Sequence, residues 1–162
     1  MKIGDVICAT VQRTAPFGLF CQYHTHEVLV LIPEISWIAS FESCDQVAAV
    51  GDALDIKIIN VDTGRNKIAG SHKALYPEND PFSASWNLQV GDVVDATVVR
   101  WVERSSRCGN TGGYLVALRP GAYAMLCEPD LQQFCPGEKC SIKINAVVPR
   151  QRSVTVELVS DL

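Results

Sequence analysis

The sequence predicts an all-β protein made of two tandem five-stranded barrels, because one pattern of strands is written twice. The octet GDVICATV at 4–11 returns as GDVVDATV at 91–98. The stretch GDALDIKI at 51–58 is answered in the same way by GEKCSIKI at 137–144. Self-similarity at a long offset is typical of repeated folding units, and 162 residues are enough for two small domains.

The first copy contains five segments rich in Val, Ile and Phe, separated by turn-forming residues. We expect strands near 4–13, 18–23, 27–32, 54–61 and 66–71. A short helix over 43–49, closed by Gly51, fits between the third and fourth strands. Asp62–Asn66 is expected to form a compact hairpin turn. Five strands with a helix after the third describe the OB-fold barrel.

The second copy repeats this pattern, with strands expected near 91–102, 113–118, 122–126, 140–147 and 153–159. Its segment Asp130–Pro136 leaves little room for a helix. Between the copies, Tyr76–Ser85 contains two prolines and many other turn formers, which indicates a linker. We therefore expect domains over 1–75 and 88–162, joined by a linker over 76–87.

The composition is that of a globular chain, with 48% hydrophobic and 20% charged residues. No apolar run approaches the roughly 20 residues of a membrane span, and the start does not resemble a signal peptide, so we expect a cytoplasmic protein without membrane contact. Residues 1–82 carry six Lys and Arg against ten Asp and Glu (net −4), and residues 83–162 carry eight against eight (net zero). Binding to a polyanion therefore needs a local basic face.

Seven cysteines stand at irregular spacings without a CxxC pair. The odd number and the spacing argue against a disulfide scaffold and against a zinc site. Cys8 and Cys21 would face each other in a hairpin centred on Thr14–Ala15, but a bulge would break that register. We therefore expect buried, reduced thiols.

Several short motifs of the first copy occur together in a characteristic order. Ala15–Phe20 reads APFGLF, Val28–Ser36 reads VLVLIPEIS, Val50–Asp52 reads VGD and Ile59–Asp62 reads INVD. Together they resemble the "S-one" RNA-binding domain, which is repeated in the largest protein of the bacterial small ribosomal subunit. The resemblance covers residues 1–98 and implies an OB-fold that binds RNA, with the second copy diverged.

The resemblance also implies site residues in the first copy: Phe17, Phe20, Asp62 and, approximately, Lys67 with Arg65 nearby. Leu31 stands where the family has a histidine that helps to hold RNA. In the second copy the aromatic turn is not recognisable, Tyr114 is its closest candidate, and Val148 replaces the family's aspartate. The resemblance therefore implies that the fold is kept and the RNA site only in part.

Flat side chains that stack on bases and cations that meet phosphates hold single-stranded nucleic acid, and stacking is worth about 1–3 kcal/mol per base. Phe17 and Phe20 flank a glycine, and we expect them to share one sheet face. The alternative is that one or both fill the barrel.

The second copy gathers arginines in two loops, which flank the binding face in OB folds. The residues are Arg100, Arg104 and Arg107 with Trp101 in one loop, and Arg150 and Arg152 in the other. Their forked donors suit phosphate, so the two loops are a candidate polyanion site. The alternative is a solvated charged loop in which Glu103 offsets part of the charge.

Motifs for catalysis are not found in the sequence, which lacks a phosphate-binding loop, a nucleophile elbow and a zinc-protease helix. His24 and His26 lack companion ligands, so we expect solvated loop histidines and no metal or cofactor. The leading interpretation is a non-enzymatic protein that binds RNA or single-stranded nucleic acid, in translation or RNA processing, with the ribosome or another protein as partner. The alternative is a protein-interaction module that kept the barrel and lost RNA affinity.

Overall fold

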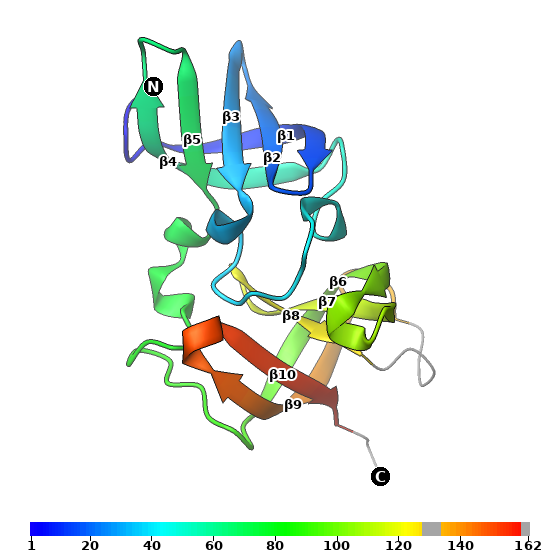
Figure 1. The fold of residues 1–162 in the computed structure, drawn as a ribbon. Coiled ribbons are helices and arrows are strands. Elements are labelled where there is room, and N and C mark those ends of the chain that lie inside the picture. The colour runs from blue at the N-terminus through cyan, green and yellow to red at the C-terminus, as the bar shows by residue number, and fades with distance from the viewer. Residues whose placement is uncertain (128–133, 160–162) are drawn as a thin grey trace. The chain divides into compact units, whose positions relative to one another are not determined.

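The computed structural model describes residues 1–127 and 134–159 (Figure 1). Contacts divide the chain into two compact units. The first unit comprises Met1–Ser36 and Ser43–Pro77, and the second comprises Trp37–Glu42 and Glu78–Leu162. Two all-β units agree with the repeat, and the domain limits at 75 and 88 stay a prediction.

The first unit is a closed barrel of five strands. They are β1 (Val6–Ala15), β2 (Gly18–Tyr23), β3 (His26–Leu31), β4 (Ala53–Asp62) and β5 (Lys67–Ser71). The order around the barrel is β1-β2-β3-β5-β4 (Figure 1). Neighbouring strands are antiparallel except β3 and β5, whose parallel pairing of Val28 with Ile68 and Leu29 with Ala69 closes the barrel. The predicted OB-type barrel is confirmed.

The interior of this barrel is filled by alternating apolar side chains, among which Val11, Leu19 and Ile56 are fully buried. At Gly70 the packing leaves no room for a side chain. A Cβ there would overlap Cγ2 of Ile56 and lie 3.0 Å from Cγ1 of Val28. Glycine therefore lets β5 approach the core at the point where it pairs with β4.

The helix predicted over 43–49 is a single 3-10 turn, η2 (Cys44–Gln46). The Gln46 side chain accepts a hydrogen bond from the Ser43 N–H at 3.3 Å, which caps the turn. Two hydrogen bonds tie this segment to β1 and to the turn that follows β1. Cys44 N–H donates to the carbonyl of Pro16, and Gly51 N–H donates to that of Val11. Because both ends are fixed, a longer helix does not fit.

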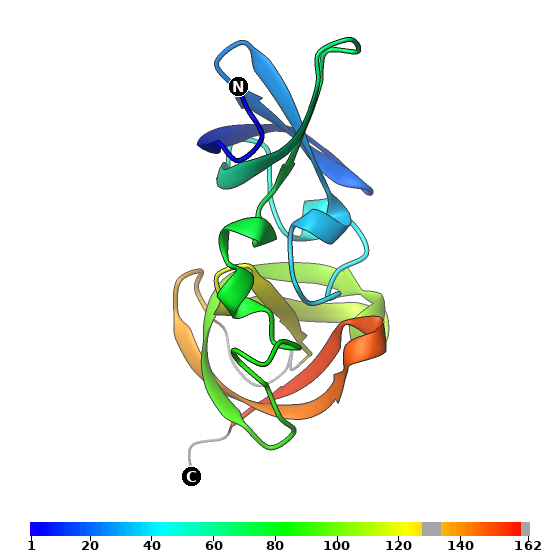
Figure 2. The ribbon, with the colours of Figure 1, turned by 90° about the vertical axis from the view of Figure 1, so that its left-hand side faces the viewer.

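The second unit is a curled five-stranded sheet (Figure 2). Its strands are β6 (Val93–Ser105), β7 (Thr111–Arg119), β8 (Ala122–Leu126), β9 (Lys139–Val148) and β10 (Ser153–Leu158). They follow the order β10-β9-β6-β7-β8, with antiparallel pairing throughout. Among the described residues no ladder joins β8 to β10. The sheet therefore differs from the closed second barrel that the repeat predicted.

The segment Trp37–Glu42, which belongs to this unit, explains the open seam. Trp37 N–H donates to the carbonyl of Gly121 at 2.8 Å, and Ala39 N–H donates to that of Arg152 at 2.7 Å. Gly121 directly precedes β8 and Arg152 directly precedes β10. Ile38 between them is 1% exposed and joins the core of the unit. Backbone groups at this end of the seam thus pair with an inserted segment.

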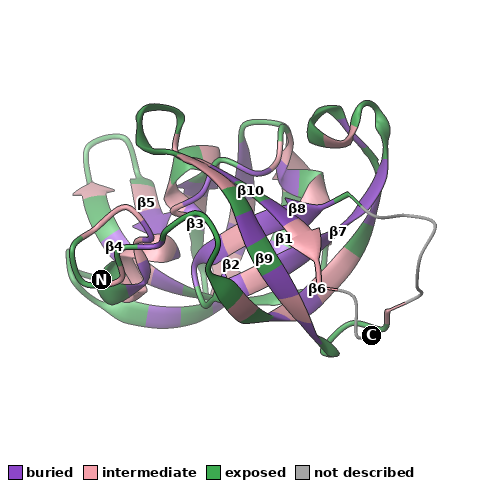
Figure 3. Cartoon of the chain, turned by 90° about the horizontal axis from the view of Figure 1, so that it is seen from below, coloured by how far each residue is buried: buried purple, intermediate pink, exposed green. Residues whose placement is uncertain are grey.

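Burial alternates along β9, where Cys140, Ile142 and Ile144 are buried (Figure 3). Phe82 and Trp86, from the predicted linker, pack against the same core. The later part of that linker is therefore part of the second unit. Most of the segment 130–136, for which we expected no helix, lies outside the described residues.

One pair of cysteines contradicts the expectation of reduced thiols. Cys108, in the turn η5 (Ser106–Cys108), and Cys127, just after β8, form a disulfide with their Cα atoms 5.2 Å apart. The prediction failed because the β6–β7 connection folds back on the end of β8, which no spacing in the sequence reveals. Cys8 is exposed, and Cys21 lies opposite Val11 across a bulged ladder, so these two do not pair.

Candidate nucleic-acid interface

The two phenylalanines of the first unit lie against each other on its surface. Their ring centroids are 5.9 Å apart and their planes are nearly perpendicular. Phe17 is 53% exposed, and Phe20 points away from the buried neighbours Leu19 and Cys21 on β2. Residues three apart on one strand would face opposite ways. The rings meet because Phe17 lies in the turn that precedes β2.

Arg13 completes this aromatic surface, and the sequence reasoning missed it. Its guanidinium carbon lies 3.8 Å from the centroid of the Phe20 ring, a distance at which the ring face attracts a cation. The guanidinium also carries the forked donors that suit phosphate. The sequence did not reveal this contact, because a hairpin centred on Thr14–Ala15 would not place Arg13 opposite Phe20, whereas the observed register of β1 and β2 does.

A groove of about 480 Å³ opens on the outer face of the barrel beside Phe20. Three of the predicted site residues line it, namely Phe20, Asp62 and Lys67. The groove also contains polar residues that the sequence reasoning missed, which are Glu27, Asn60 and Asn66. An aromatic wall, a cation and several hydrogen-bonding groups together suit one or two nucleotides of a single strand.

The β4–β5 turn sets the position of the groove's cation. Asp62 Oδ1 accepts the Arg65 N–H at 3.2 Å, and Asp62 Oδ2 lies 3.9 Å from Arg65 Nε. Asn66 then adopts the left-handed conformation, with φ of 54°, and Lys67 pairs with Asp62 across the two strands. The Arg65 side chain is 78% exposed, so this ion pair adds little stability. Its role is to shape the turn.

Leu31, which replaces the family's histidine, is 43% exposed at the end of β3. It stands opposite Gly18, the residue that follows Phe17. The surface near Phe17 therefore presents an apolar side chain at the position where the resemblance implies a histidine.

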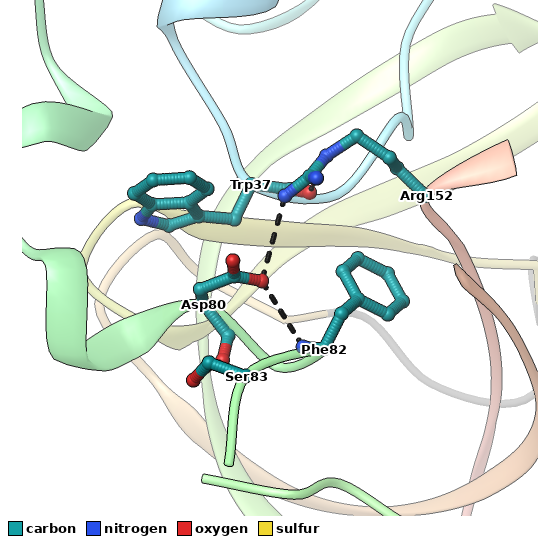
Figure 4. A network of polar contacts seen from close by, with 5 residues as sticks. All are labelled: Trp37, Asp80, Phe82, Ser83 and Arg152. Atoms are coloured by element: carbon teal, nitrogen blue, oxygen red, sulfur yellow. Dashed lines mark hydrogen bonds and ion pairs between the residues drawn. The ribbon is translucent and has the colours of Figure 1, made fainter. Parts of the chain in front are cut away.

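In the second unit, Arg152 is held by internal contacts (Figure 4). Its Nε donates to the carbonyl of Trp37 at 2.9 Å, and its NH2 group lies 3.4 Å from Asp80 Oδ1. The guanidinium carbon also lies 5.1 Å from the ring centroid of Phe82 and 5.5 Å from that of Trp37. Asp80 Oδ1 in turn accepts the Phe82 N–H at 3.0 Å. These contacts hold the segment 37–42 to the second unit and make Arg152 a structural residue.

The remaining second-unit arginines are only partly brought together. The NH1 group of Arg107 donates to Ser153 Oγ at 3.1 Å, which places the β6–β7 loop beside the start of β10. Arg104, Arg107 and Arg150 are exposed, and Arg100 on β6 is half-buried. Arg107 therefore links the β6–β7 loop to the first residue of β10, while the half-exposed guanidinium of Arg152 is engaged by Trp37 and Asp80.

Trp101 lies across the β6–β7 ladder from Tyr114, with ring centroids 4.8 Å apart. The indole covers Gly112, where an added Cβ would overlap it. Trp101 is 40% exposed, whereas Tyr114 is 7% exposed. One indole is thus available at the surface, and Tyr114 serves the core.

Burial raises the pKa of two cysteine thiols in the first unit. Burial raises the pKa of Cys21 to about 11, and burial with nearby Asp45 raises that of Cys44 to about 12. Such thiols stay protonated at neutral pH and are poor nucleophiles.

In the described part of the chain, no three His, Cys, Asp or Glu side chains could hold a metal ion together. No described helix is long and apolar enough to cross a membrane.

A closed five-stranded barrel with a groove lined by Phe20 and Lys67 defines a small β-barrel domain of the OB type. In a comparison with protein families, residues 1–73 match the S1 RNA binding domain. The resemblance found in the sequence motifs is thereby confirmed.

Relatives extend over more of the chain. The small ribosomal subunit protein bS1 of Staphylococcus saprophyticus is 27% identical over 98% of this chain and 40% of that protein. The bS1 homolog of Bacillus cereus is 30% identical over 78% of this chain and 30% of that protein. Polyribonucleotide nucleotidyltransferase of Amoebophilus asiaticus is 34% identical over 46% of this chain and 10% of that protein. The chain thus spans well under half of each relative.

Among solved structures, GSP13 from Bacillus subtilis has a TM-score of 0.43 and 24% identity, over 48% of this chain and 59% of that chain. A likeness at this level carries no functional argument.

Proposed function

We propose that this chain binds single-stranded RNA through the outer face of its first unit, without catalysing a reaction. The carrying observation is the groove in which Phe20, Asp62 and Lys67 come together, inside the part of the chain that matches the S1 RNA binding domain. Phe17 and Phe20 would stack on bases, and Arg13, Arg65 and Lys67 would meet phosphates.

The second unit would contact RNA through a surface of its own. Arg100, Arg104, Arg107 and Arg150 would meet phosphates, and the exposed indole of Trp101 would stack on a base. Arg152 is left out of this set because its guanidinium is engaged by Trp37 and Asp80.

The setting would be translation, in the cytoplasm, with the ribosome as a partner. Support comes from the bS1 relatives, which align with 98% and 78% of the chain. The absence of catalysis is supported by the same relatives.

Fluorescence anisotropy with a labelled single-stranded RNA of about 12 nucleotides tests this function. Changing Phe17 and Phe20 to alanine together should weaken binding at least tenfold, since each lost stacking contact is worth about 1–3 kcal/mol. Val50→Ala is the control, because Val50 is 66% exposed in the same unit and does not line the groove. Absence of wild-type binding at low salt would overturn the proposal and favour a protein-interaction module.

A further inference from the structure

The groove of the first unit contains more carboxylates than a site for phosphate would favour. Glu27 and Asp62 line it together with one cation, Lys67. A carboxylate only accepts hydrogen bonds, and it repels a phosphate held nearby. Two further cations of the first unit do not line the groove, namely Arg13, against Phe20, and Arg65, in the β4–β5 turn. The phosphates of a bound strand therefore favour the rim, and the bases favour the groove.

The two carboxylates differ in their freedom to meet a ligand. Asp62 is engaged by Arg65 through both of its oxygens. Glu27 is exposed on β3, and no hydrogen bond or ion pair engages its carboxylate within residues 1–127 and 134–159. Of the two carboxylates in the groove, Glu27 is therefore the one free to accept from a ligand.

Strand register places a donor beside this acceptor. Val28 of β3 pairs with Ile68 of β5 in parallel, so Glu27 and Lys67, each one residue earlier, stand side by side and line the same groove. Phe20 of β2 pairs with Leu29, which is two residues, or about 7 Å, along β3 from Glu27. A base against Phe20 would therefore direct one edge at Glu27 and Lys67.

The bases differ in how well they match a carboxylate next to an ammonium group. Guanine presents two adjacent donors, N1–H and the 2-amino group, followed by the acceptor O6. A carboxylate can accept both donors at once, and an ammonium group can donate to O6. Adenine and cytosine present one amino donor next to a ring-nitrogen acceptor, and uracil presents one N–H between two carbonyl groups.

We infer that the groove selects guanine, with Glu27 accepting from N1–H and the 2-amino group and Lys67 donating to O6. The inference rests on the proposed RNA binding and adds a base preference to it. Read-out of the Watson–Crick edge is the usual means of specificity for unpaired bases. A good bidentate pair discriminates against a wrong base by a factor on the order of ten or more.

The test uses the full chain and two labelled octamers, eight uridines and the same octamer with one central guanosine. We expect the guanosine octamer to bind about tenfold more tightly. An octamer with inosine, which lacks the 2-amino group, should lie between the two. In Glu27→Gln the preference should fall to twofold or less, while affinity for the uridine octamer rises because a negative charge has been removed.

Glu138→Gln is the matched control, since it makes the same change of charge on an exposed residue of the second unit. It should leave the preference intact. Equal wild-type affinity for the two octamers would overturn the inference and leave the proposed function standing, as would an unchanged preference in Glu27→Gln. Failure of both octamers to bind at low salt would overturn the proposed function itself.

Discussion

Arg152 gives the sharpest test of how the second unit is built. Replacing it with alanine removes the donor to the Trp37 carbonyl at 2.9 Å and the ion pair with Asp80 at 3.4 Å. Its φ of 51° is as unusual for alanine as for arginine, so backbone strain is the same in both proteins. The change therefore isolates the side-chain contacts.

The expected loss follows from these contacts. A hydrogen bond from a charged donor contributes about 1.5–3 kcal/mol. The ion pair is partly exposed, at 41% and 21%, and adds about 0–1 kcal/mol. The two ring contacts, at 5.1 and 5.5 Å, each add about 0.5 kcal/mol. Because such contributions are not additive, we expect Arg152→Ala to lower the free energy of unfolding of the second unit by about 2–3 kcal/mol.

Urea unfolding followed by tryptophan fluorescence measures this loss selectively. The chain has three tryptophans, Trp37, Trp86 and Trp101, and all belong to the second unit. With a urea slope of about 2 kcal/mol/M, the midpoint should fall by about 1 M. Arg150→Ala is the control, because Arg150 is exposed and should change stability by less than about 0.5 kcal/mol. Equal midpoints for the two variants, with weaker RNA binding in Arg152→Ala alone, would refute the structural role.

Three further predictions concern single contacts. Gly70→Ala should destabilise the first unit by about 1–3 kcal/mol, since its Cβ would overlap Ile56 in a filled core. Thermal unfolding followed by circular dichroism measures this loss, and an equal loss of stability in Gly64→Ala would contradict the prediction. Burial lowers the pKa of the His72 imidazole below its ordinary value of 6.5. Just below that pH, His72 is therefore protonated more fully in the unfolded chain than in the folded one. The stability is complete above about pH 6.5 and falls as pH drops below it; melting of wild type and His72→Gln at pH 7.5 and 5.5 checks this, and equal pH dependence would contradict it. Cys108→Ser removes the disulfide bond to Cys127, 19 residues away, and should lower the free energy of unfolding of the second unit by about 2–3 kcal/mol. Dithiothreitol should have the same effect on the wild-type protein. If neither changes the stability, the bond is not formed.

The strands of the first unit could be predicted from the sequence because the pattern that indicates them is local. Alternating apolar residues between turn formers located β1 to β5 within two residues of the observed ends. The helix after β3 was overestimated, because the hydrogen bonds from Cys44 to Pro16 and from Gly51 to Val11 join residues that are distant in the sequence. Local propensity does not register such contacts.

Residues of the candidate site could be predicted where they belong to a recognisable sequence motif. Residues that reach the site only through the pairing of strands could not be predicted. Phe20, Asp62 and Lys67 lie in recognisable motifs and share the groove. Arg13 and Glu27 enter the site only through pairing across strands. The open seam of the second sheet and the Cys108–Cys127 bond depend on segments that are inserted or that fold back. The periodicity of the sequence therefore does not predict them.

The most direct measurement of the central claim is a backbone-amide NMR titration of the full chain with a single-stranded RNA octamer. The account predicts that the largest shift changes fall on β2, β3 and the β4–β5 turn, around Phe20, Glu27 and Lys67. Changes confined to residues outside the groove, or no changes at low salt, would contradict it.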